Sequence, residues 1–435
     1  MTGFSTRAVH AGAQPDPTTG ARVQPIYQTT SYVFRDADHA ANLFALQEFG
    51  DIYSRIGNPT VTALEARIAD LEGGTMGLAT ASGHAAQILA LHLLMEPGTN
   101  LVAARQLYGG SINQFNHAIR KFGWQVRWAD IDDPQSFADA VDENTRLIFT
   151  ESLANPGGLV TDMAAVAKVA QEAGVPYIVD NTMASPALCR PLEHGAHIVV
   201  ESLTKFVGGH GNSVGGVLVD GGRFDWMAHK DKFPTLTTPQ AYYNDLVFAD
   251  TFGAMPLGPD GANVDIAFAI AAKAFSLRDI GPALSPFNAF LLLTGCETLP
   301  LRMDKHCENA LGVARWLSGH EKVSWVRYAG LEGDPHHARA QTYMPKGAGA
   351  VFTFGLKGGH EAGVKLVAGT KLFSHLANIG DTRSLIIHPA STTHSQLTED
   401  QKIAAGAAPE TVRLSIGIED IDDIIADLDQ ALAAL

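Results

Sequence analysis

The sequence predicts an α/β fold built on a mainly parallel sheet that helices cover on both faces. Short apolar segments at residues 100–104, 124–128, 146–150 and 175–179 alternate with stretches of helical periodicity. Taken together these segments are predominantly apolar rather than alternately apolar and polar, which is typical of strands buried on both faces of a sheet. A regular alternation of strand and helix favours parallel pairing, because each helix returns the chain to the same end of the sheet.

Residues 1 to about 60 carry Gly, Pro and Thr throughout and show no sustained periodicity. Such a segment cannot bury a core of its own, so we expect an arm that lies across a larger body, with a partner subunit as the natural candidate. A first helix is expected next, because Thr62-Ala-Leu-Glu65 has the form of a capping box and Gly73-Gly74 would end the helix.

A second helix is expected over residues 85–94, directly after a turn at Gly83. The amides of Gly83 and His84 would face an anion at the positive end of that helix. The sequence therefore predicts a cradle for a phosphate group at this turn. The imidazole of His84 is expected to be packed or solvated rather than catalytic.

The remaining elements of the sheet follow the same alternation up to about residue 219. Further strands and helices are expected at residues 109–121, 135–141, 163–173, 196–200 and 217–219. The stretch 220–260 is irregular and rich in aromatic residues, Pro and Asp.

From residue 285 one long amphipathic helix is expected to run toward Trp316, and strands such as 350–354 then alternate with helices. This change of pattern indicates a second, smaller domain of α+β type. We therefore expect an amino-terminal arm at residues 1–60, a large domain at 61–285 and a carboxyl-terminal domain at 286–435.

Two polar residues follow predicted buried strands and carry the strongest functional signal. Lys205 comes just after the strand 196–200, and Asp180 ends the strand 175–179. A buried lysine loses its proton readily, and pyridoxal phosphate binds such a lysine through its aldehyde. The same cofactor needs a carboxylate at its ring nitrogen. This order of lysine and aspartate indicates a pyridoxal-phosphate site.

The hydroxyls of Ser202 and Thr204 stand beside Lys205 in the sequence, at the right place to reach a cofactor phosphate. Two alternatives stay open from the residues alone: Lys205 as an exposed loop residue, and Asp180 as the cap of the next helix.

Composition excludes several other classes of function. The net charge of −15, with no basic stripe, argues against nucleic-acid binding. The three cysteines are too scattered for a disulfide framework or a zinc site. A proline lies between His388 and His394, and no acidic or thiol ligand accompanies the two histidines, so no metal site is expected there. No signal peptide and no apolar run of about 18 residues is present, which favours a soluble cytoplasmic protein.

The chain resembles, over nearly all its length, the Cys/Met-metabolism family of fold type I pyridoxal-phosphate enzymes, and within it most of all the O-acetylhomoserine sulfhydrylases. The motifs that carry the resemblance are Tyr53-Ser-Arg-Ile-Gly-Asn-Pro-Thr60, Ala81-Ser-Gly-His84, Leu107-Tyr-Gly-Gly110, Glu151-Ser-Leu-Ala-Asn-Pro156, Asp180-Asn-Thr182, Ser202-Leu-Thr-Lys205, His388-Pro-Ala-Ser-Thr-Thr-His394 and Val412-Arg-Leu-Ser-Ile-Gly-Ile-Glu419. Each motif is weak alone, and their joint order is specific.

The resemblance implies a seven-stranded sheet and a role for each matching residue. Lys205 would bind the aldehyde, Asp180 the ring nitrogen, and Tyr108 would stack on the ring and help in acid/base steps. Asn155 would bond the phenolic oxygen of the cofactor and contact the substrate. The implied phosphate contacts are Ser82, Gly83, the amide of His84, Ser202, Thr204 and, from a neighbouring subunit, Tyr53 and Arg55.

The resemblance further implies that Arg413 and Ser384 bind the α-carboxylate of the substrate. Arg413 lies on a predicted apolar strand, where a charged residue needs a partner, and two-pronged binding of a carboxylate would supply one. A structural ion pair is the alternative for Arg413, a buried structural ring for Tyr108, and a turn residue for Asn155.

The implied reaction is the γ-replacement of the acetyl group of O-acetyl-L-homoserine by sulfide, which gives L-homocysteine and acetate and belongs to methionine biosynthesis. The implied assembly is a homotetramer made of two active dimers. Alternatives within the class are a methionine or cystathionine γ-lyase and a sulfhydrylase of O-acetylserine or O-succinylhomoserine. A binding protein that keeps the fold without catalysis is the alternative outside it. The sulfur donor, the acyl group and the role of residues 220–260 stay open.

Overall fold

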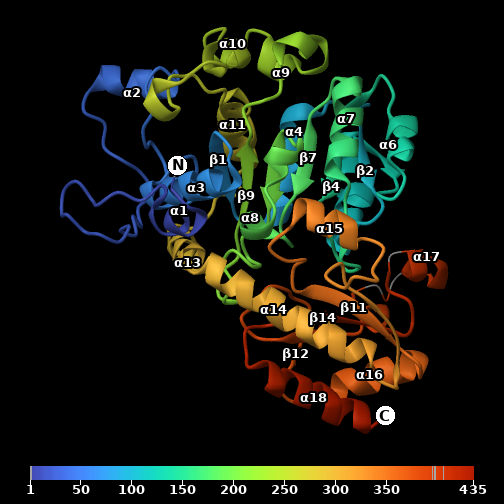
Figure 1. The fold of residues 1–435 in the computed structure, drawn as a ribbon. Coiled ribbons are helices and arrows are strands. Elements are labelled where there is room, and N and C mark those ends of the chain that lie inside the picture. The colour runs from blue at the N-terminus through green and yellow to red at the C-terminus, as the bar shows by residue number, and fades with distance from the viewer. Residues whose placement is uncertain (1, 394, 396–397, 405) are drawn as a thin grey trace.

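A computed structural model describes residues 2–393, 395, 398–404 and 406–435 of the chain. His394, which ends one of the family motifs, lies outside the described residues. The architecture is two packed layers of sheet and helix joined by a pair of long helices, with the carboxyl terminus at the far end of the second layer (Figure 1).

The first sheet has seven strands, and the expectation of a mainly parallel α/β sheet is confirmed. The four neighbouring pairs from β8 through to β3 are parallel, whereas β9 runs antiparallel to both β8 and β1. In spatial order the strands are β1 (Met76–Thr80), β9 (Gly216–Asp220), β8 (Ile198–Glu201), β7 (Tyr177–Asp180), β4 (Thr145–Glu151), β2 (Asn100–Ala104) and β3 (Gln125–Ala129).

Helices pack against this sheet as the apolar strands require. The main ones are α3 (Pro59–Glu72), α4 (Gly83–Leu94), α6 (Pro134–Ala140), α7 (Met163–Ala173) and α11 (Ala267–Ala271). The predicted helix 109–121 is a succession of α5 (Gly109–Asn113), a π-helical turn at Gln114–Ala118 and a 3-10 turn at Ile119–Phe122.

The second sheet has five strands and is antiparallel except for the pair β12–β13. Helices α14 (Leu299–Ser318), α16 (Gly359–Gly369) and α18 (Ile421–Ala433) pack beside it. The strands in order are β10 (Val323–Arg327), β11 (Val351–Leu356), β14 (Thr411–Ser415), β13 (Leu385–Ile387) and β12 (Ser374–His375).

The single long helix expected from residue 285 is wrong, because the structure has two helices. Helix α13 (Pro286–Glu297) ends before Thr298, and α14 begins at Leu299. Pro300 has no N–H to donate to the carbonyl of Cys296, and its ring crowds that carbonyl, so the hydrogen-bond ladder cannot continue through this point. The buried Arg302 of α14 then donates to the carbonyls of Phe206 (2.6 Å) and Val207 (3.0 Å), which fastens the second layer to the loop after Lys205.

Helix α3 begins earlier than the capping-box pattern indicated. Asn58 is its N-cap, and the Asn58 Oδ1 accepts a hydrogen bond from the Thr60 amide at 3.0 Å. Glu65 lies buried inside the helix and accepts from the amide of Ala79 at 2.9 Å instead of capping. The motif was therefore misread, because a buried glutamate three residues after a threonine matches the same pattern.

The amino-terminal segment is only partly an extended arm. Helix α1 (Phe4–His10) packs on α3 and α13, and the buried Arg67 donates to the carbonyls of Ala8 (3.0 Å) and Ala11 (2.6 Å). Beyond it the chain loops away from the first sheet and returns through the short helix α2 (Ala37–Phe44), shown in blue in Figure 1.

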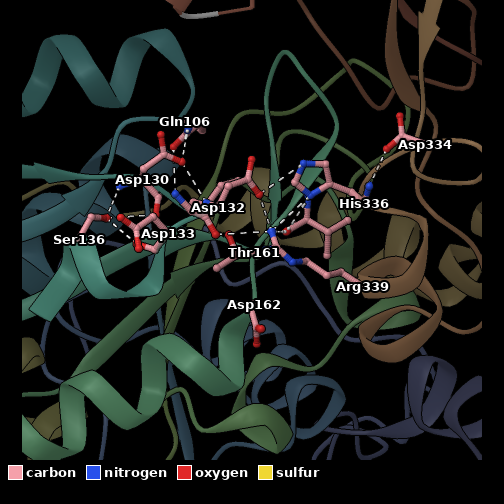
Figure 2. A network of polar contacts seen from close by, with 12 residues as sticks. Gln106, Asp130, Asp132, Asp133, Ser136, Thr161, Asp162, Asp334, His336 and Arg339 are labelled. Carbon is pink, nitrogen blue, oxygen red and sulfur yellow. Dashed lines mark hydrogen bonds and ion pairs between the residues drawn. The ribbon is translucent and has the colours of Figure 1, made fainter.

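A polar network joins the two layers at the carboxyl-terminal side of the first sheet (Figure 2). Arg339, on α15 (His337–Tyr343) of the second layer, donates to the Asp132 carboxylate at 2.7 Å and to the Val160 carbonyl at 3.3 Å. The neighbouring His336 is 3% exposed, and its Nδ1 lies 3.3 Å from the amide nitrogen of Val160. These contacts fix one layer against the other. Within the part of the chain that the structure describes, no helix has the length and apolar character to cross a membrane.

Candidate active site

A cavity of about 240 Å³ opens at the carboxyl ends of β4, β7 and β8 and is closed by loops of the second sheet. Ligands of parallel sheets gather at this edge, because the helix amino termini and the loops converge there. The residues that line it are Ser82, Gly83, His84, Gln87, Tyr108, Glu151, Leu153, Asn155, Asp180, Thr182, Met183, Ser202, Thr204, Lys205, Val214, Ala377, Asn378, Ile379, Thr393 and Arg413.

Lys205 reaches into the cavity from the turn that follows β8. The turn is fixed by backbone bonds from the Lys205 amide to the Ser202 carbonyl (3.2 Å) and from the Gly209 amide to the Lys205 carbonyl (2.7 Å). The Lys205 Nζ donates to the Asn378 Oδ1 at 2.5 Å. Burial, together with the charge of Arg413, lowers the pKa of Lys205 to about 8. About a tenth of this amine is therefore neutral at pH 7, far more than for an ordinary lysine, and the neutral form is the one that acts as a nucleophile or base.

Asp180 ends β7 and lies at the back of the cavity. Its Oδ1 accepts from the Thr182 amide at 2.9 Å, and its Oδ2 accepts from the Gln87 side chain at 3.0 Å. Burial raises the pKa of Asp180, although these hydrogen bonds oppose the rise. Gln87 lies on α4 and also donates to the Ser111 hydroxyl at 3.0 Å, so the carboxyl group is held in one orientation from two sides.

Glu151 is a second buried acid, opposite Asp180 in the pairing of β4 with β7. Its Oε1 accepts from the Tyr108 amide at 2.6 Å, and its Oε2 accepts from the Asn155 amide at 3.0 Å. Burial and the charge of Asp180 raise the pKa of Glu151 well above its ordinary value. Its place in the site is structural, since one carboxyl group fixes the backbone of both Tyr108 and Asn155.

Tyr108 and His84 form the wall beside α4. Their rings meet edge to face with centroids 5.8 Å apart, and 45% of Tyr108 is exposed toward the opening. The carbonyl of His84 accepts from the Gln114 side chain at 3.1 Å. A tyrosine held at its amide by Glu151 and at its ring by His84 presents one face to the cavity.

The amino terminus of α4 forms the end of the cavity next to Ser202. Ser82 is the N-cap of this 12-residue helix, and the Ser82 Oγ accepts from the Ala85 amide at 3.2 Å. The first N–H groups of a helix have no partner within it, so those of Gly83 and His84 are available to an anion. A side chain at Gly83 would collide with Ser202, because a Cβ there would lie 2.7 Å from the Ser202 Cβ.

Arg413 enters the cavity from β14 in the second sheet and is 6% exposed. Its Nη1 donates to the Asn155 Oδ1 and its Nη2 to the Asn378 carbonyl, both at 3.1 Å. In the described part of the chain no carboxylate forms an ion pair with this guanidinium, and burial lowers the pKa of Arg413 to about 10. Its fork is held by neutral oxygens, and a carboxylate ligand would bind more strongly than they do.

Three of the predicted site residues lie away from the cavity. Ser384 is fully buried, and its hydroxyl donates to the Glu419 Oε2 at 2.9 Å. Tyr53 is 43% exposed, and the Arg55 guanidinium lies 5.5 Å from the centroid of its ring. Arg55 Nη1 donates to the carbonyl of Arg278. Within one chain these side chains do not reach the other candidates.

Sequence reasoning missed Asn378, Glu151 and Gln87. Asn378 lies in the loop between β12 and β13 and carried no pattern. Glu151 opens a motif that was noted for Asn155, so a buried strand that ends in an acid was a usable signal. Gln87 comes one helical turn after Gly83, on the face of α4 that begins at the cradle, and this periodicity could have found it.

The residues of the cavity fit pyridoxal phosphate group by group. Lys205 presents an amine to an aldehyde, and Asp180 presents a carboxyl group to a ring nitrogen. Ser82, Ser202 and Thr204 present hydroxyls to a phosphate at the helix terminus. The buried Gln87 Oε1 has no hydrogen-bond partner in the described chain, which is consistent with a further donor in this cavity.

Comparison with known proteins agrees with this geometry. A family profile described as Cys/Met metabolism PLP-dependent enzyme matches residues 5–433. The chain is 52% identical to the O-acetyl-L-homoserine sulfhydrylase of Leptospira meyeri over 98% of this chain and 96% of that protein. It is 50% identical to O-acetyl-L-homoserine sulfhydrylase 1 of Thermus thermophilus over 99% of this chain and 100% of that protein.

A solved structure from Campylobacter jejuni, which carries N'-pyridoxyl-lysine-5'-monophosphate, matches with a TM-score of 0.94. It is 39% identical and covers 99% of this chain and 100% of its own. Sequence, fold and the arrangement of lysine, aspartate and helix terminus therefore lead to one assignment: the chain belongs to the Cys/Met metabolism family of pyridoxal-phosphate-dependent enzymes.

Proposed function

We propose that the protein replaces the acetyl group of O-acetyl-L-homoserine by sulfide and so forms L-homocysteine and acetate. Relatives that span nearly the whole chain carry the name O-acetyl-L-homoserine sulfhydrylase, which supports this choice of reaction. The observation that carries the proposal is that an amine, an acid and a guanidinium with no carboxylate partner in the described chain converge on one cavity: Lys205, Asp180 and Arg413.

Several polar residues of the cavity have a task in this reaction. Pyridoxal phosphate, when bound, supplies an electron sink that stabilises negative charge at the α carbon of the amino acid. Lys205 would hold the cofactor through its aldehyde, and its amine, when free, would take the α proton of the amino acid and move protons at the β carbon. Asp180 would hold a proton at the ring nitrogen of the bound cofactor, in the orientation that Thr182 and Gln87 fix.

Arg413 binds the α-carboxylate of the amino acid with its two-pronged fork. The side-chain amide of Asn155, which contacts Arg413, orients both cofactor and substrate. Tyr108 covers the ring of the cofactor and assists proton transfer at the open side of the cavity. We leave Ser384 out of the proposed substrate contacts, because Glu419 already engages its hydroxyl.

The wider organisation follows the same proposal. An arm at residues 1–60, a cofactor-binding domain at 61–285 and a carboxyl-terminal domain at 286–435 would assemble as a cytoplasmic homotetramer. In each active dimer Tyr53 and Arg55 would serve the phosphate of the neighbouring subunit. The exposure of Tyr53 is consistent with such a contact.

The test is the variant Lys205→Ala together with a substrate panel. We expect the variant to lose the visible absorbance of lysine-bound cofactor and to lose turnover, because no other amine of the described chain lines the cavity. The wild-type protein should release acetate from O-acetyl-L-homoserine only with sulfide or a thiol present. Formation of 2-oxobutanoate from methionine or cystathionine without a thiol would instead identify a γ-lyase.

A further inference from the structure

A second cavity, of about 380 Å³, lies beside the candidate active site, between loops of the first sheet and the face of the second. Its walls come from the loop after β2, the hairpin of β5 (Leu153–Ala154) and β6 (Leu159–Val160), strands β10 and β11, and α17 (Glu399–Ala404). Of the described lining residues, Asn155 alone belongs to both cavities. The proposed reaction takes place in the first cavity and gives the second one no task.

The charged groups of the second cavity are two arginines, Arg105 and Arg327, and none of the described residues that line it is acidic. Arg105 is exposed, and within the described chain its side chain has no carboxylate partner. The Arg327 Nε lies 3.7 Å from the Oδ2 of Asp334, a residue of the network in Figure 2. In a protein with a net charge of −15, a cavity with two arginines and no acid concentrates positive potential and attracts anions.

Much of the remaining lining is apolar. Leu107 is 2% exposed, and Leu159 and Ile403 line the cavity from the hairpin and from α17. Trp325 pairs in register with Gly355 on β11, and its indole ring occupies the space beside this residue that a side chain would otherwise take. Such walls suit the hydrocarbon part of a ligand, whereas the arginines suit a carboxylate. A small organic carboxylate with an apolar body has both parts.

One row of side chains on the second sheet leads from this cavity to the first. Arg327 on β10 pairs with Thr353 on β11, and Thr353 pairs with Arg413 on β14. Directly paired residues of antiparallel strands project from the same face of a sheet. Arg327 and Thr353 line the second cavity, and Arg413 lines the first, two strand spacings or about 10 Å from Arg327. A charge bound in the second cavity therefore acts on the Arg413 guanidinium at short range.

Two loops that carry residues of the candidate active site also border the second cavity. The first runs through Arg105 and Leu107 into Tyr108, and the second is the hairpin turn that begins with Asn155. Glu151 accepts from the amides of Tyr108 (2.6 Å) and Asn155 (3.0 Å), so one carboxyl group holds both loops. The Asn155 Oδ1 in turn accepts from Arg413 at 3.1 Å. A ligand in the second cavity thus touches the supports of the substrate site.

We propose that the second cavity is a binding site for a small organic carboxylate with an apolar body, and that its occupation weakens the binding of the amino-acid substrate at Arg413. The bound negative charge lowers the positive potential that the α-carboxylate of the substrate meets. The binding itself rests on the cavity alone. Its effect on the substrate rests on the proposed function, in which Arg413 binds that α-carboxylate, so the two parts are tested separately.

The first experiment measures binding to the holoenzyme by ligand-observed NMR, with 4-phenylbutyrate and its neutral amide, 4-phenylbutanamide, as probes. We expect the carboxylate to bind with a Kd on the order of 1 mM, as the ligand efficiency of drug-sized molecules allows, and the amide to bind about tenfold more weakly. Arg105→Met should weaken binding of the carboxylate about tenfold and leave binding of the amide unchanged. The control Arg127→Met removes an arginine that pairs with Asp142 outside the cavity and should change neither affinity.

Three results would overturn the binding site: no measurable binding of the carboxylate, equal affinities for carboxylate and amide, or unchanged affinity for the carboxylate in Arg105→Met. Binding that is lost in Arg413→Ala and kept in Arg105→Met would place the probe in the first cavity and would also overturn it. Folding of Arg105→Met is not at risk, because the side chain is exposed. These measurements involve no turnover, so their outcome is separate from the proposed function, which is tested by Lys205→Ala.

The second experiment measures initial rates with O-acetyl-L-homoserine and sulfide at rising concentrations of 4-phenylbutyrate. We expect the KM for O-acetyl-L-homoserine to rise severalfold and then to level off, with unchanged kcat, because probe and substrate can occupy their two cavities together. The effect should disappear in Arg105→Met, whose KM without the probe should match the wild-type value. A KM that rises without limit would show competition in the first cavity, and a KM that stays constant while the second cavity is filled would refute the coupling.

Discussion

At the scale of single residues, the site depends on how few groups hold Lys205 and Arg413 in place. Asn378 contacts both, since its side-chain oxygen accepts from the Lys205 Nζ and its carbonyl accepts from Arg413. A substitution at Asn378 can remove the contact with Lys205, which uses the side chain. It cannot remove the contact with Arg413, because that carbonyl belongs to the backbone. A substitution at this position should therefore affect the lysine and spare the arginine.

We predict that Asn378→Leu lowers the pKa of Lys205 further. A hydrogen bond to the protonated amine favours the charged form, so its loss favours the neutral form and moves the pKa down from about 8, by about one unit for a bond of this kind. The pH dependence of the rate at which the cofactor-free protein captures pyridoxal phosphate would report this shift. Asn378→Asp places a negative charge beside the amine and should move the midpoint upward. A midpoint that stays in place in both variants would show that the contact has no influence on the amine.

At the scale of secondary-structure elements, capping residues decide where helices begin. Asn58 starts α3 and is fully buried, and its side chain accepts from the Thr60 amide at 3.0 Å and donates to the Tyr27 carbonyl at 2.8 Å. The cap therefore joins the helix to the arm as well as satisfying the helix terminus.

We predict that Asn58→Ala destabilises the fold by about 1–3 kcal/mol, because it leaves the buried amide of Thr60 without a partner and removes the hydrogen bond to the Tyr27 carbonyl. The midpoint of urea unfolding would measure the loss. Asp36→Ala removes the exposed N-cap of α2 and serves as the control, with an expected cost near the lower end, about 0.5–1 kcal/mol. Equal costs for the two variants would contradict the role given to burial.

The sequence allowed the elements of the first sheet to be predicted because buried parallel strands are continuous apolar runs, and those before Asp180 and Lys205 are fully buried in the structure. The boundary at Thr298 was missed because the apolar periodicity continues on both sides of it. Asn378 could not be predicted, because its contact with Lys205 spans 173 residues and depends on how the second sheet packs. Local sequence patterns predict strands and the residues at their ends. They contain no information on how the two layers pack against each other.

At the scale of the whole molecule, the site is divided between the two layers. Asp180, Ser202 and Lys205 come from loops of the first sheet, whereas Asn378 and Arg413 come from the second. Cofactor binding should then depend mainly on the first layer, with Asn378 acting on it only through Lys205. Binding of the amino-acid substrate should depend on the fit between the layers, which the network in Figure 2 maintains.

We predict that Arg339→Met raises the KM for O-acetyl-L-homoserine severalfold and leaves the affinity for pyridoxal phosphate unchanged. The guanidinium is the donor that joins Asp132 and the carbonyl of Val160 to the second layer, so its loss lets Arg413 shift relative to Lys205. Lys168→Met removes an exposed ion pair with Glu172 on α7 and should leave both constants as they are. If Arg339→Met weakened cofactor and substrate binding together, the first layer would itself depend on the contact, and the division of labour between the layers would be wrong.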